Sequence, residues 1–383
     1  MIYLDNAATT KPKKAVVEAM MPYFLEKWHN PSALYSAANK VKKDVENARL
    51  IVADFLNVSF NEVYFTSGGS EGNSWAIKGF VDYCKDNNFT PIIVITPIEH
   101  KSILACVEGL KKNVNTYYVD VDRKGFIDLE QLEKMLHCLS IKDGNRILVS
   151  VQYANSEIGT IQHINEISNI VHKYNAVFHT DAVGAFGKVP INVKKDNIDI
   201  LTASGHKIGC PKGIGILYKN KNVNINPLIY GGQMDEMRGG TENVPYIIAF
   251  AKAVELCKSA FLEKSSAQYD CRDYMISRLK EKFGCIVNGD LERRLPNNIN
   301  VTFSQNITGE ALIYMLDMCD IYVSAGSACD SRSVKSSTVL KAIGLTDEQA
   351  KKTIRISLPD DVDMHIIDNV IEEIKKQIKL LVQ

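Results

Sequence analysis

The residue whose type and setting most clearly suggest a chemical role is Lys207, in the segment Ser204-Gly205-His206-Lys207. It lies between an apolar run over 198–203 and a glycine-rich loop. Most lysines of a soluble protein are solvated surface charges, so Lys207 alone predicts little. Asp181, however, ends another apolar run, over 177–180. Ligand sites in open α/β sheets collect at the carboxyl ends of strands, which is where this amine and this carboxylate are expected.

Lys207 and Asp181 together point to one cofactor. A lysine that forms a Schiff base and an aspartate that contacts a pyridinium nitrogen are the protein groups that pyridoxal phosphate (PLP) chemistry requires. We therefore interpret Lys207 as the covalent anchor of PLP and Asp181 as the partner of the ring nitrogen.

Three further polar residues, Ser70, His100 and Asn155, each follow a separate apolar run. Gly69 and Ser70 open an expected helix, whose N–H groups and dipole can bind a phosphate. A plain turn with a serine N-cap explains the same two residues, and a hydrogen-bonded loop residue would explain His100. Independent turn residues would seldom line up so consistently, so we expect these side chains to converge at one edge of a sheet.

Nine cysteines are scattered along the chain without a C-x-x-C pair, which matches neither a disulfide framework nor a zinc site. We expect most of them to be buried as small hydrophobic residues. Cys329 differs because it lies among small and polar residues over 324–331, after an apolar run. An exposed thiol on such a loop is suited to act as a nucleophile.

Composition limits the remaining possibilities. The 383 residues are 45% hydrophobic and 23% charged, enough for two domains with their own cores. Lys+Arg and Asp+Glu both number 45, so no global charge favours direct binding of nucleic acid or an anionic membrane. No apolar run is long enough to span a membrane, and the first residues lack the pattern of a signal peptide. We expect a cytoplasmic protein without a metal site.

The hydrophobic pattern predicts an α/β protein. Helical patterns cover 13–28 and 32–56, and short apolar runs then alternate with helical stretches. This alternation predicts a mostly parallel sheet covered on both faces, in a large domain over 13–259. Residues 1–12 with 260–383 are expected to form a smaller α+β domain. The expected strands lie at 63–66, 92–96, 147–151, 177–180, 198–203, 213–218, 298–303, 321–323 and 353–357.

The order of these motifs resembles the PLP-dependent cysteine desulfurases of the class V aminotransferase superfamily, the type that supplies sulfur for iron–sulfur cluster assembly. The resemblance covers essentially the whole chain and implies a PLP-dependent transferase fold of the aspartate aminotransferase type. The matching segments are 3–10, 65–71, 99–101, 155–159, 179–182, 204–207, 211–215, 238–245, 326–329 and 354–357.

The resemblance implies a role for each candidate residue. Lys207 would hold PLP and move the Cα proton of the substrate, while His100 would stack on the ring and assist proton transfer. Asn155 would contact the phenolic oxygen of PLP at the substrate site, and Arg355 would bind the substrate carboxylate. The PLP phosphate would be held by Gly69, Ser70, Ser204, His206 and, from the neighbouring subunit of a homodimer, Thr241.

Cys329 would take the sulfur of L-cysteine as a persulfide, releasing L-alanine, and pass it to a protein acceptor. A loop supplies the mobility that this transfer requires. Asp330 would disfavour the thiolate and Arg332 could offset it. The receiving pathway stays open among iron–sulfur assembly, tRNA thiolation, cofactor biosynthesis and DNA sulfur modification.

Three departures from the family pattern keep alternatives open. Gly184 stands where the family usually has a glutamine that helps bind the phenolic oxygen, 233–237 differs from the usual Glu-Arg-Gly, and Ser336-Ser337 replaces a Pro-Ser pair. A selenocysteine lyase, or another PLP-dependent lyase or aminotransferase of the same fold, is one alternative. A low-activity scaffold subunit is the other.

Overall fold

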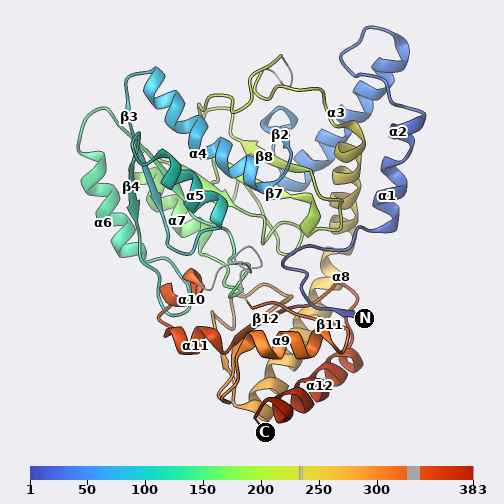
Figure 1. Ribbon diagram of the computed structural model, residues 1–383. Helices are drawn as coiled ribbons and strands as arrows, with labels where there is room; N and C mark the ends of the chain where they lie inside the picture. The colour runs from blue at the N-terminus through green and yellow to red at the C-terminus, as the bar shows by residue number, and fades with distance from the viewer. Residues whose placement is uncertain (233, 235, 326–336, 383) are drawn as a thin grey trace.

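The computed structural model describes residues 1–232, 234, 236–325 and 337–382. Its larger part is built on a seven-stranded sheet with the order β2-β8-β7-β6-β5-β3-β4 (Figure 1). Strand β8 is antiparallel to both of its neighbours, and the other pairs are parallel. The strands are β2 (Val63–Thr66), β3 (Thr90–Ile95), β4 (Asn115–Tyr118), β5 (Asn145–Ser150), β6 (Val177–Asp181), β7 (Ile200–Ser204) and β8 (Gly215–Lys219).

Helices cover both faces of this sheet because its strands are apolar on both sides. Ile92 and Val94 of β3 belong to the core under α1, α3, α6, α7 and α8, whereas Ile93 and Ile95 belong to the core under α4 and α5. The helices are α1 (Lys14–Met20), α2 (Pro22–Leu25), α3 (Ser36–Leu56), α4 (Gly69–Asp86), α5 (Lys101–Leu110), α6 (Leu129–Ser140), α7 (Ile164–Lys173) and α8 (Val244–Phe283), with 3-10 turns η1 (Phe60–Glu62) and η2 (Gly205–Lys207).

The smaller part has its own core, formed by β1, the second half of α8 and the elements that follow it. A three-stranded sheet has the order β12-β10-β9, and β1 pairs in parallel with β11, so the N-terminus joins this part (Figure 1). The elements are β1 (Ile2–Tyr3), β9 (Ile286–Val287), β10 (Asn298–Thr302), α9 (Gly309–Asp317), β11 (Ile321–Tyr322), α10 (Thr338–Ala342), α11 (Asp347–Lys351), β12 (Thr353–Ser357) and α12 (Met364–Val382).

The expected α/β architecture with a mostly parallel sheet is confirmed, with local differences. The helix expected over 13–28 is two shorter helices, because Pro22 begins α2. The edge strand β4 was not predicted, since its polar and aromatic residues give no apolar run. The expected domain boundary at 259/260 lies within α8 and stays a prediction.

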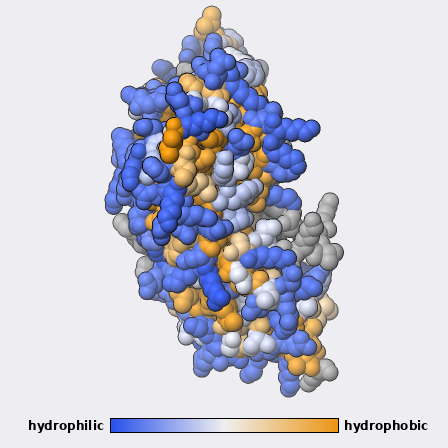
Figure 2. Space-filling model, turned by 90° about the vertical axis from the view of Figure 1, so that its left-hand side faces the viewer, coloured by the Kyte–Doolittle hydropathy of each residue, from blue (hydrophilic) through white to orange (hydrophobic). Residues whose placement is uncertain are grey.

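Within the described residues, no helix combines the length and apolarity needed to cross a bilayer. Figure 2 shows the face beside α6, where hydrophilic side chains predominate and hydrophobic ones lie between them.

Candidate active site

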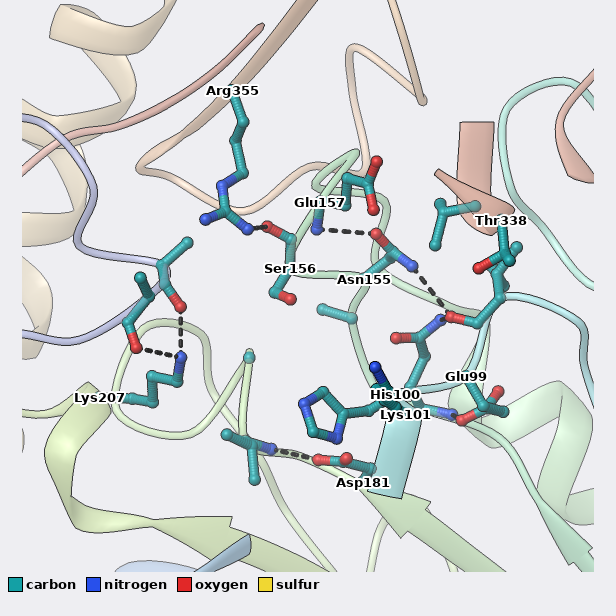
Figure 3. A pocket seen from close by; sticks show the side chains of 18 of the residues that line it. Glu99, His100, Lys101, Asn155, Ser156, Glu157, Asp181, Lys207, Thr338 and Arg355 are labelled. Carbon is teal, nitrogen blue, oxygen red and sulfur yellow. Dashed lines mark hydrogen bonds between the residues drawn. The ribbon is translucent and has the colours of Figure 1, made fainter. Parts of the chain in front are cut away.

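A cavity of about 320 Å³ lies between the carboxyl edge of the large sheet and the smaller part of the chain. Its wall includes His100, Asn155, Asp181 and Lys207, which the strand ends predicted, and Arg355, which the resemblance implied. Figure 3 shows Arg355 on the side opposite Asp181, with Lys207 and Asn155 on the two flanks. Of the five side chains expected to converge at the sheet edge, His100, Asn155, Asp181 and Lys207 therefore meet at this cavity, whereas Ser70 does not line it.

Asp181 is the last residue of β6 and is 5% exposed. The Val183 N–H donates to its Oδ1 at 2.9 Å, and Asn73 Nδ2 donates to its Oδ2 at 2.7 Å. Both carboxylate oxygens thus accept hydrogen bonds, which hold the side chain in place. Asn73, on α4, escaped the sequence analysis, although it lies about one helical turn after Ser70 on the face turned to the sheet.

Lys207 ends the 3-10 turn after β7, and its Nζ donates to the carbonyls of Ala7 and Ala8, the latter at 2.8 Å. The N-terminal segment therefore forms part of the site. Two further lysines, Lys101 and Lys188, also line the cavity and were not predicted as site residues. Burial lowers the pKa of Lys188 to about 8, against the opposing effect of Asp360.

His100 is the N-cap of α5, and its Nδ1 accepts a hydrogen bond from the Ser102 N–H at 3.1 Å. The same nitrogen lies 2.8 Å from Ser102 Oγ. The preceding Glu99 is 3% exposed and receives hydrogen bonds from Thr96 and the Gln152 N–H. Burial is the main reason that the pKa of Glu99 is raised to about 8, so this carboxyl is protonated at neutral pH.

Arg355 reaches the cavity from β12 and is 3% exposed. Its Nη2 donates to Asp5 Oδ1 at 2.7 Å, and its Nη1 to the Ser156 carbonyl at 3.3 Å. Its Nε is buried and has no hydrogen-bond partner in the part of the chain that the structure describes. An arginine in this arrangement can accept a carboxylate.

Asn155 uses its side chain to shape the adjoining turn. Its Oδ1 accepts from the N–H groups of Glu157 and Ile158 at 2.8 and 2.9 Å, and its Nδ2 donates to the Ile98 carbonyl at 3.2 Å. The amide connects the loops after β3 and β5, whose residues both line the cavity.

The residues expected to hold a phosphate do not line this cavity, but several of them lie together. A Cβ built on Gly69 would be 3.7 Å from Ser204 Cβ, which places the start of α4 beside the end of β7. The N-cap residue of α4, Gly68, supplies no side-chain cap, so the N–H groups and dipole at this end can receive an anion.

Neither His206 nor Thr241 lines the cavity. His206 Nδ1 lies 3.2 Å from Thr9 Oγ1, and burial, with the Lys207 charge, lowers the pKa of His206 to about 4. Thr241 is exposed. Thr241 comes three residues after Arg238, whose Nε lies 3.0 Å from Oε1 of Glu71 on α4.

Gly184 lies in the described part of the chain, whereas Cys329 does not. Gly184 lines the cavity, and a Cβ at this position would lie 2.8 Å from the Ala154 carbonyl oxygen. The backbone is therefore too close to Ala154 for any side chain without a local shift. Cys329, with Gln233 and Asp235, lies outside the described residues.

Comparisons with known proteins agree with this geometry. Residues 2–370 match the family model "Aminotransferase class-V". The chain is 41% identical over 384 residues to "Cysteine desulfurase IscS" of Methanosarcina thermophila, covering 99% of this chain and 92% of the relative. It is 42% identical over 385 residues to the protein of that name from Clostridium botulinum strain Hall, covering 99% and 94%.

Solved structures show the same similarity. One titled "NIFS-LIKE PROTEIN" superposes with a TM-score of 0.91 at 35% identity, covering 99% of this chain and 100% of the other. Another, titled "SspA in complex with cysteine", has a TM-score of 0.81 at 33% identity, covering 94% and 99%.

Proposed function

Because this chain belongs to the class V aminotransferase family, we propose that it is a PLP-dependent cysteine desulfurase that converts L-cysteine to L-alanine. The observation that carries the proposal is the single cavity in which Lys207, Asp181 and Arg355 meet. An amine, a buried carboxylate and a buried guanidinium are the groups needed to hold PLP and an amino-acid carboxylate.

The residues present fit PLP. Asp181 supplies a buried carboxylate for the ring nitrogen, and Lys207 supplies the amine to which the cofactor would be joined. The uncapped start of α4, with Gly69, Ser70 and the neighbouring Ser204, would receive the phosphate. When bound, the cofactor supplies a ring that accepts electrons from the substrate Cα.

The protein side chains would bind the substrate and transfer protons. Arg355 would hold the substrate carboxylate, using the Nε that has no partner in the described chain. Lys207 Nζ would move the Cα proton, and His100 would assist proton transfer beside the ring. Asn155 would stay in place through its bonds to the adjoining turn.

Cys329 would receive the sulfur, as the family resemblance implies. Its thiolate would attack the sulfur of the bound L-cysteine, forming an S–S bond as the Cβ–S bond breaks. The electron pair of the broken bond would leave with carbon, and protonation there would complete L-alanine. The persulfide on Cys329 would then pass to a protein acceptor, for example in iron–sulfur cluster assembly.

We further propose a cytoplasmic homodimer in which Thr241 reaches the phosphate of the neighbouring subunit. The exposed position of Thr241 supports this role. The Arg238–Glu71 pair, with side chains 21% and 9% exposed, ties its segment to α4, the helix whose start would hold the phosphate. His206, which is neutral and bonded to Thr9, would support the site as a hydrogen-bonding group rather than as a cation.

The comparisons do not favour the two alternative functions, since the curated relatives carry the name cysteine desulfurase. The test is to incubate PLP-loaded protein separately with L-cysteine and L-selenocysteine and to quantify L-alanine from each. Efficient L-alanine formation from L-cysteine is the expected result. Activity on L-selenocysteine alone would favour the lyase, and PLP binding without any product would favour the scaffold subunit.

A further inference from the structure

A continuous set of hydrogen bonds links Asp181 to His100 through two residues that the proposed mechanism does not use. Asn73 Nδ2 lies 2.7 Å from Asp181 Oδ2 and 2.9 Å from Ser102 Oγ. Ser102 Oγ lies 2.8 Å from His100 Nδ1. Asn73 is 1% exposed, so water does not compete for its amide.

The direction of each hydrogen bond follows from the carboxylate. Asp181 already accepts from the Val183 N–H on Oδ1, and only an N–H donor is suited to its Oδ2. This requirement fixes the orientation of the Asn73 amide, because the flipped orientation would place Oδ1 against the carboxylate. The other Nδ2 hydrogen then points at Ser102 Oγ, which acts as an acceptor and keeps its own hydrogen for His100.

His100 Nδ1 therefore faces two donors, the Ser102 hydroxyl and the Ser102 N–H at 3.1 Å. A ring nitrogen that accepts hydrogen bonds carries no proton, so the proton of the neutral imidazole is on Nε2. We propose that Asn73 and Ser102 are positioning residues that connect Asp181 to His100 and hold His100 in its Nε2–H tautomer.

The consequence for catalysis rests on the proposed function. His100 enters the reaction as a donor from Nε2, and the same nitrogen takes the proton back. The positions of Asp181 and His100 also depend on each other, because Asn73 bonds to Asp181 directly and to His100 through Ser102. Replacing Asn73 therefore affects both groups, although its side chain bonds directly to only one of them.

The tautomer can be measured in cofactor-free protein labelled with 15N-histidine, by two-bond 15N–1H correlation. The His100→Gln variant identifies the His100 signals among the eight histidines. In the wild type we expect the Nε2–H form to exceed the Nδ1–H form by about tenfold or more, given two hydrogen bonds to Nδ1. A predominant Nδ1–H form would overturn the proposal, whether or not the protein proves to be a desulfurase.

Variants test the two positioning residues. Ser102→Thr keeps the hydroxyl and should keep the wild-type signals, whereas Ser102→Ala and Asn73→Leu should shift His100 towards a mixture of tautomers. Ser140→Ala removes an exposed serine hydroxyl on α6 and serves as the matched control. Unchanged His100 signals in both Ser102→Ala and Asn73→Leu would show that neither residue sets the tautomer.

Discussion

Asp5 and Arg355 lie 350 positions apart in the chain and form a partly buried ion pair, with Nη2 and Oδ1 2.7 Å apart. The pair joins the N-terminal segment to β12, where Asp5 forms a bridge with Ser357. Two residues later the same segment accepts hydrogen bonds from Lys207. One short stretch of chain thus contacts both the expected carboxylate-binding residue and the expected cofactor lysine.

Replacing Asp5 with Asn should weaken substrate binding. The variant keeps the shape of the side chain but removes the charge that orients Arg355, and a hydrogen bond to a charged group is worth ~1.5 to 3 kcal/mol. We expect the KM for L-cysteine to rise about tenfold, with kcat changed less. Steady-state kinetics provide the measurement, and Glu18→Gln, in an exposed pair with Lys14, is the control. An unchanged KM would show that Asp5 does not position Arg355.

Replacing Glu99 with Gln should remove a pH dependence of stability. The pKa of Glu99 is raised from 4.5 to about 8, so the folded protein keeps this proton where the unfolded chain loses it. The free energy of unfolding therefore falls as the pH rises from about 4.5 towards 8, by ~1.4 kcal/mol for each pKa unit of difference.

The amide oxygen of Gln can accept from the Gln152 N–H as Glu99 does, and its amide N–H can donate to Thr96 Oγ1 once that hydroxyl, which donates to Glu99, turns its hydrogen away. Cofactor-free Glu99→Gln should therefore match the wild type near pH 4.5 and exceed it by at least ~1 kcal/mol at pH 8. Urea unfolding at both pH values makes the comparison. A constant difference between the two proteins would mean that Glu99 is ionised when folded.

Restoring the family's usual glutamine at position 184 should destabilise this protein. The Cβ would lie 2.8 Å from the Ala154 carbonyl oxygen, which is backbone and cannot rotate away. We expect Gly184→Gln and Gly184→Ala each to lose ~1 to 3 kcal/mol in urea unfolding. Gly109→Ala is the control, because nothing lies near its Cβ and an exposed helical glycine gains ~0.5 to 1 kcal/mol from alanine. Full stability of Gly184→Ala would mean that Ala154 shifts freely.

Three lysines, Lys101, Lys188 and Lys207, line the cavity, and we assign the cofactor to Lys207 alone. Borohydride reduction of PLP-loaded protein, followed by peptide mass mapping, should place the pyridoxyl group on Lys207. Lys207→Ala should abolish the label, whereas Lys188→Arg should retain it on Lys207. A label on Lys188 in the wild type would reverse the assignment, since its pKa of about 8 leaves part of this amine uncharged at neutral pH.

The sequence was most informative where apolar runs end in polar residues. Asp181 closes β6 and Lys207 follows β7, so strand ends alone predicted their convergence. The edge strand β4 could not be predicted, because Asn115, Thr116 and the two tyrosines form no apolar run. Three of these four residues are exposed in the structure.

Roles that depend on distant contacts could not be predicted. Asp5 belongs to a matching motif, but its pairing with Arg355 requires the N-terminus to join the smaller part of the fold. Asn73 and Ser102 lie 29 positions apart on separate helices, and only the packing of α4 against α5 brings them together. Burial likewise sets the pKa values of Glu99 and Lys188, and no local pattern reports it.

The most direct test of the proposed function is a single turnover of PLP-loaded protein with L-cysteine, in which L-alanine and the Cys329 persulfide are quantified together by mass spectrometry. The account predicts equal amounts of both in the wild type, and a Cys329→Ser variant that retains PLP but forms no persulfide. Sulfur transfer by Cys329→Ser at the wild-type level would contradict it, as would L-alanine formation without persulfide on Cys329.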